Sequence, residues 1–76
     1  MRPKDEDLFA AVTRAAFEQR RKTLVNALGG NPSVSRSKDA VRDALGKMGI
    51  SPTARGETLS LEEFIQLADL LSEESS

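Results

Sequence analysis

The sequence predicts an all-α protein, a compact bundle of about four short helices. Alanine and leucine dominate its apolar residues, as is typical of helices. No segment of four or more residues alternates cleanly between apolar and polar positions, so strands are not indicated. With 76 residues, the chain has room for one small domain. We place this domain at residues 5–71.

A break divides the first helical region in two. The apolar residues around Val12 lie on one side of a helical wheel, and those around Val25 lie on another side, displaced by more than about 90°. Because a single helix would keep one apolar side, we predict two helices, at 5–18 and 20–28. Gly29 is expected to end the second helix as a left-handed cap.

Two further helices follow a polar loop. Ser37 can cap a helix over 37–48, whose apolar residues recur at i, i+3, i+4 and i+7. The last helix is expected at 60–71, where Ser60 and Glu63 have the spacing of a capping box.

The apolar sides of these helices should form the core, and the chain ends should lie outside it. Leu61 belongs to the inward side of the last helix. We expect residues 1–4 to be disordered or artificial in origin, and residues 72–76 to be an acidic flexible tail. Three aromatic residues are expected to be the largest core side chains: Phe9, Phe17 and Phe64.

Composition excludes several classes of function. The chain has no cysteine and no histidine, which removes disulfides, thiol nucleophiles, Cys/His zinc sites and His-based triads. Its adjacent carboxylates diverge on a helix, so no general acid/base pair is indicated. No cofactor motif and no membrane-spanning apolar stretch occur. The start of the chain is acidic where a signal peptide would be apolar, so we expect a cytoplasmic protein without membrane contact, and a monomer.

Charge is distributed unevenly along the chain. Residues 1–55 hold all 11 basic residues and six of the 12 acidic ones, a net charge of +5. Residues 56–76 hold the other six acidic residues and no basic one, a net charge of −6. This asymmetry indicates one basic and one acidic surface, unless ion pairing within the molecule consumes both signs.

The basic run Arg20-Arg21-Lys22 is the most informative local pattern. Three consecutive cations on a helix spread over about 200°, so at least one should turn inward and pair with a carboxylate, for which Glu57 is the candidate. The others, together with Arg14, should project outward as phosphate ligands. Taken alone, the triplet is weak evidence for nucleic-acid binding, because solvation or docking of a partner accounts for such a run more often.

Two segments, residues 15–28 and 48–64, resemble the C-terminal domain of bacterial 16S rRNA adenine N6,N6-dimethyltransferases. The first contains Ala-Phe-Glu-Gln-Arg-Arg-Lys-Thr-Leu, and the second contains Gly-Ile-Ser-Pro-Thr-Ala-Arg-Gly-Glu-Thr-Leu-Ser. They occur in the family's order and extend the likeness over residues 5–71. Gly56 departs from the expected alanine, which should only loosen that turn, and residues 31–38 match little.

The resemblance implies a parent enzyme that uses S-adenosylmethionine to dimethylate two adjacent adenosines of 16S rRNA. In that family an N-terminal catalytic domain holds the cofactor, and no part of it occurs here, so this chain should bind no cofactor and lack methyltransferase activity by itself. Its implied role is to bind and position rRNA of the small ribosomal subunit. The RNA-binding candidates are Arg20, Arg21 and Lys22 by resemblance, and Arg14 and Arg55 by charge and placement.

Two alternatives remain open at this point. The domain could be a structural cap that packs on the catalytic domain, with its basic run consumed in ion pairs. It could also be a free-standing helical module for protein interaction, provided that its reading frame begins at Met1.

Overall fold

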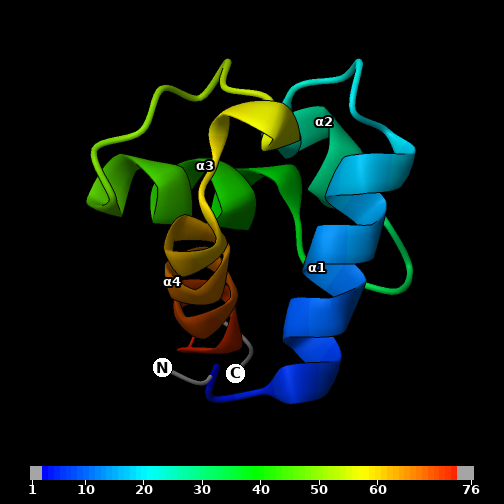
Figure 1. Cartoon of the computed structure of the whole chain (residues 1–76), viewed down its shortest axis with the longest axis vertical. Coiled ribbons are helices and arrows are strands. Elements are labelled where there is room, and N and C mark those ends of the chain that lie inside the picture. The colour runs from blue at the N-terminus through cyan, green and yellow to red at the C-terminus, as the bar shows by residue number, and fades with distance from the viewer. Residues whose placement is uncertain (1–2, 74–76) are drawn as a thin grey trace.

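The computed structural model describes residues 3–73, and within this range it is helical with no β-strand (Figure 1). The elements in chain order are α1 (Glu6–Glu18), α2 (Leu24–Leu28), α3 (Lys38–Lys47), the short 3-10 helix η1 (Gly56–Thr58) and α4 (Leu61–Glu73). The predicted all-α bundle of four short helices is therefore confirmed.

The helices pack around one apolar core. α1 contacts α4, α2 and η1, while α3 contacts α2 and α4. In Figure 1, α1 and α4 stand upright, and η1 lies above α4 beside the end of α1. No polar or charged residue among those described is buried, so burial of apolar surface is the main stabilising term. The largest fully buried side chains of the core are Leu24, Leu28, Leu45, Leu67, Leu71, Val12, Val34 and Val41.

Helix capping follows the sequence closely. The Ser37 hydroxyl accepts a hydrogen bond from the Ala40 amide at 3.1 Å and starts α3. At the start of α4, the Ser60 hydroxyl accepts from the Glu63 amide at 3.2 Å, and the Glu63 carboxylate accepts from the Ser60 amide at 2.8 Å. These reciprocal bonds confirm the predicted capping box.

The predicted break after residue 18 is correct, but the second helix begins later than expected. It starts at Leu24 and not at Arg20, because Thr23 is extended and caps it by accepting a hydrogen bond from the Asn26 amide. The Leu24 amide donates to the carbonyl of Ala54, at 2.8 Å, in place of a helical partner. A tertiary contact with residues 54–55 thus fixes the start of this helix, and helix propensity alone does not reveal it.

The role predicted for Gly29 was wrong in its detail. Gly29 has a φ of −68°, which any residue adopts, and the left-handed position is Gly30 at 82°. Gly29 is needed for space instead, because a Cβ there would lie 2.7 Å from the Cα of Lys38 and 2.6 Å from the carbonyl oxygen of Val25. Glycine at this position lets the end of α2 approach the start of α3.

Two predicted core residues lie at the surface. Phe64 is buried and Phe9 is half-buried, but Phe17 is 60% exposed, and Leu61 is 66% exposed. Phe17 occupies the last turn of α1, and the chain turns away before a further helix can cover it. Leu61 is the first residue of α4, where no preceding turn shields it.

The chain ends are only partly described. The Lys4 amide donates a 2.7 Å hydrogen bond to Asp69, and its ammonium lies 3.6 Å from the carboxylate of Glu73, so the residues before α1 contact α4. α4 extends two residues beyond the predicted end at 71. Residues 1–2 and 74–76, where a disordered start and flexible tail were predicted, lie outside the described range. No helix within that range is long and apolar enough to cross a membrane.

Candidate nucleic-acid interface

The predicted basic residues Arg20, Arg21 and Lys22 lie in a turn between α1 and α2. α1 ends because Gln19 leaves the helical conformation, while its amide still donates to the carbonyl of Ala15 at 3.1 Å. The Lys22 amide then donates to the carbonyl of Gln19 at 2.8 Å and closes the turn. We call residues 19–22 the basic turn.

Arg55 is brought to the basic turn by backbone pairing. Thr23, directly after the turn, forms an isolated antiparallel bridge with Arg55. The next residue, Gly56, is buried against the last turns of α1, where its added Cβ would lie 3.0 Å from the Cβ of Ala16. Gly56 therefore permits a close approach of η1 to α1, which is a different role from the loosened turn that we expected.

The four cations at this place, Arg20, Arg21, Lys22 and Arg55, are exposed. The ion pairs of residues 3–73 join Lys4 to Glu73, Arg42 to Asp39 and Lys47 to Asp43, and none involves the basic turn or Arg55. The expected pair between an inward cation and Glu57 is absent from this set, so that prediction was wrong. Its premise fails because the three cations follow a turn and not a helix, and no geometry forces one of them inward.

Arg14 lies on α1, one helical turn before Phe17, so the two side chains share a face of the helix. It is exposed and takes part in none of the ion pairs of the described residues. All five predicted RNA-binding residues are thus exposed and outside the ion pairs of residues 3–73, and four of them lie in or beside the basic turn.

An exposed aromatic ring lies at the end of α1, immediately before the basic turn, and its exposure was not predicted from the sequence. Phe17 packs against Phe64, with ring centroids 5.8 Å apart and planes inclined by 46°. Phe64 is 3% exposed, so it anchors the contact in the core, whereas Phe17 remains 60% exposed. The available signal was the position of Phe17 at the end of a helix, immediately before a polar and basic run.

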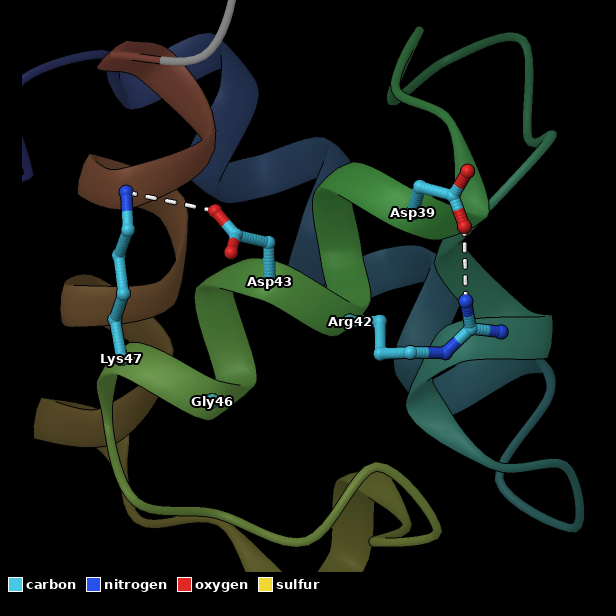
Figure 2. A pocket seen from close by; sticks show the side chains of 5 residues that line it. All are labelled: Asp39, Arg42, Asp43, Gly46 and Lys47. Carbon is cyan, nitrogen blue, oxygen red and sulfur yellow. Dashed lines mark hydrogen bonds and ion pairs between the residues drawn. The ribbon is translucent and has the colours of Figure 1, made fainter.

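A second charged surface lies on α3 and has a different character (Figure 2). Its hollow is lined by residues of α3 alone: Asp39, Arg42, Asp43, Gly46 and Lys47. Figure 2 shows both cations of this surface turned toward carboxylates of the same helix, Arg42 to Asp39 at 2.8 Å and Lys47 to Asp43 at 3.5 Å. Because two carboxylates balance the two cations, the lining of this hollow has no net positive charge and offers little to an external anion.

The described residues do not fit a methyltransferase cofactor or a metal. They include no strand from which a glycine-rich loop could present backbone amides to S-adenosylmethionine. Three hollows of this range are open and lined largely by charged and polar side chains. Nor does any group of three or more acidic side chains within this range have the arrangement of a metal site.

Comparison with known proteins shows that this chain is similar in sequence to proteins named ribosomal RNA small subunit methyltransferase A. The chain is 53% identical over 68 residues to the protein of that name from Caldanaerobacter subterraneus subsp. tengcongensis, and 51% identical over 67 residues to that of Moorella thermoacetica. It is 44% identical over 70 residues to that of Lachnoclostridium phytofermentans. No family model matches the chain.

These matches cover nearly all of this chain but a small part of each relative. They include 92%, 90% and 88% of the chain in the proteins from Lachnoclostridium, Caldanaerobacter and Moorella, and 24%, 24% and 22% of those proteins. The resemblance inferred from the two sequence segments is therefore confirmed. This chain is homologous to a segment that makes up about a quarter of the length of ribosomal RNA small subunit methyltransferase A.

Proposed function

We propose that this chain is the C-terminal helical domain of an S-adenosylmethionine-dependent 16S rRNA adenine dimethyltransferase, and that it helps to bind and position small-subunit rRNA. The names of the relatives support the assignment to rRNA methylation. Cofactor binding and methyl transfer would then belong to the part of such an enzyme that lies outside the matched quarter. A cytoplasmic location follows from this role.

One observation carries the RNA-binding part of the proposal. Arg20, Arg21 and Lys22 are exposed, and the carboxylates of residues 3–73 neutralise none of them. Clustered, unpaired cations attract phosphates and orient a protein on RNA without specifying sequence. Had the three side chains been held by acidic partners, the structural-cap alternative would have been favoured.

The test compares two triple variants that remove the same charge. Arg20→Gln/Arg21→Gln/Lys22→Gln neutralises the basic turn, whereas Lys4→Gln/Arg42→Gln/Lys47→Gln neutralises the three ion-paired cations. Binding to a small-subunit rRNA hairpin is measured at several salt concentrations, and circular dichroism verifies that each variant is folded.

We expect the basic-turn variant to lose affinity. The negative slope of its log affinity against log salt should become shallower by about 2, since each phosphate contact contributes roughly 0.7 to 0.9 to the magnitude of that slope. The matched control should bind nearly as well as the unmodified chain. Equal losses in both variants would show that only net charge matters. Unchanged affinity in the folded basic-turn variant would contradict the proposal and support the structural cap.

A further inference from the structure

An exposed aromatic ring lies beside the unpaired cations. Phe17 is 60% exposed, and its side chain precedes the basic turn by two residues. Covering an exposed phenylalanine ring removes apolar surface from water and is favourable. The ring can therefore contribute to the binding of a partner, and its surroundings indicate the chemistry of that partner.

The ring is held in a defined position. Phe64 is 3% exposed and belongs to the core, and the two ring centroids lie 5.8 Å apart. This contact ties the ring of Phe17 to the core on one side, while most of the side chain remains exposed. Leu61, 66% exposed, lies one turn before Phe64 on α4.

The size of this patch favours a nucleobase over a protein. Phe17 and Leu61 are the exposed large hydrophobic residues of the described range. Two side chains are far fewer than a separate protein partner needs for a stable interface, since each partner usually buries about 800 Å². A single nucleobase, by contrast, needs only one aromatic face for stacking.

The neighbouring charges favour the same partner. Arg14 precedes Phe17 by one helical turn, and the basic turn follows it, while Gly56 packs on Ala16 and so brings Arg55 to the same end of α1. An aromatic face among unpaired cations is the combination by which proteins bind single-stranded nucleic acid, with bases on the ring and phosphates on the cations.

We infer that Phe17 stacks on an unpaired base of the bound RNA, while the basic turn contacts the phosphates next to that base. This inference rests on the proposed RNA-binding function and adds to it a preference for unpaired nucleotides. Paired bases are stacked inside an A-form helix and cannot reach the ring.

The experiment uses the whole 76-residue chain, which contains no tryptophan and no tyrosine. Phe17→Trp therefore introduces a sole fluorophore at the proposed stacking position. It is titrated with a short oligoadenylate and with an RNA duplex carrying the same number of phosphates. Gln66→Trp, at an exposed position in the middle of α4, is the control fluorophore.

We expect the oligoadenylate to quench the tryptophan at position 17 and to leave that at position 66 unchanged. In the anisotropy of labelled RNA, Phe17→Leu keeps an apolar side chain without the ring and should bind the oligoadenylate about fivefold to tenfold more weakly, with duplex binding unchanged. The Phe17→Ala variant should lose at least as much affinity for the oligoadenylate.

Three outcomes would overturn the inference. The first is binding of oligoadenylate by Phe17→Trp without a change in its emission, and the second is an affinity of Phe17→Leu equal to that of the unmodified chain. The third is a blue shift of Phe17→Trp with protein concentration in the absence of RNA, which would identify a second copy of the chain as the partner. If the basic-turn variant still loses affinity in these cases, the proposed function stands without stacking. If the unmodified chain binds no RNA, both fail.

Discussion

The basic turn and the charged surface of α3 both carry exposed cations, but only the α3 surface carries carboxylates among them. On α3, carboxylates and cations alternate at spacings of three and four residues, so Arg42 and Lys47 find partners on their own helix. In the basic turn, three cations follow one another without an acid between them, and the backbone leaves the helix. The spacing of acidic and basic residues therefore decides whether a cation pairs with a carboxylate of its own helix or remains unpaired and can contact a partner.

This difference depends on how the turn is supported. The bridge between Thr23 and Arg55 and the contact of Gly56 with Ala16 hold the turn against the rest of the molecule. The α3 surface needs no such support, because an α-helix fixes its own side-chain spacing. Substitutions at the support should therefore affect the basic turn far more than comparable changes on α3.

The largest effect on stability is expected for the substitution Gly56→Val. An added Cβ already lies 3.0 Å from the Cβ of Ala16, so two further methyl groups must push η1 away from α1. We expect a loss of about 2 kcal/mol in the free energy of unfolding, together with weaker RNA binding. Urea denaturation followed by circular dichroism measures the loss. The Gly56→Ala variant adds one methyl group and should cost clearly less; equal costs would mean that the contact is not the cause.

A smaller effect on stability is expected for substitution of Arg36, a cation whose side chain donates hydrogen bonds to backbone carbonyls within the molecule. Its Nε donates to the carbonyl of Leu71 at 2.7 Å, and its Nη1 donates to the carbonyls of Val34 and Ser35. Arg36→Ala leaves these carbonyls without their charged donor, so we expect a loss of about 1–2 kcal/mol of stability with RNA affinity unchanged at a temperature where the variant is folded. Arg36→Lys should recover part of the loss. Weakened RNA binding by the folded Arg36→Ala variant would place this residue in the interface as well.

On the α3 surface, Gly46→Ala should act in the opposite direction. Gly46 is exposed inside the helix, and an added Cβ there would meet nothing within 4 Å. Alanine lowers the entropy that the chain loses on folding, so we expect a gain of about 0.5–1 kcal/mol. In a domain of this size the melting temperature should rise by roughly 4 °C. RNA affinity should not change, and a loss of affinity would indicate that this surface, too, contacts RNA.

Local patterns predicted most of this fold, and tertiary contacts account for what they missed. The capping box of Ser60 and Glu63 and the cap at Ser37 follow from residues three positions apart, so sequence suffices for them. The start of α2 depends on Ala54, some thirty residues away, and no local pattern contains that pairing.

The same distinction applies to the candidate site. The five cations could be predicted from their residue types, because charged side chains are nearly always exposed. The exposure of Phe17 could not, since helical periodicity places it with the apolar residues around Val25 on the assumption that the helix continues. The helix ends one residue later, and the ring consequently remains at the surface.

The smallest effect is expected for Asp39→Asn, which removes the carboxylate partner of Arg42 on α3. Exposed pairs at this spacing contribute little, so stability should change by no more than about 0.5 kcal/mol. The unpaired Arg42 then resembles a cation of the basic turn in everything except its place. If place matters, RNA affinity stays within about twofold of the unmodified chain, as measured by anisotropy at low salt, where long-range attraction is strongest. A larger increase would show that any unpaired cation recruits RNA, and the distinction between the two surfaces would then be one of pairing alone.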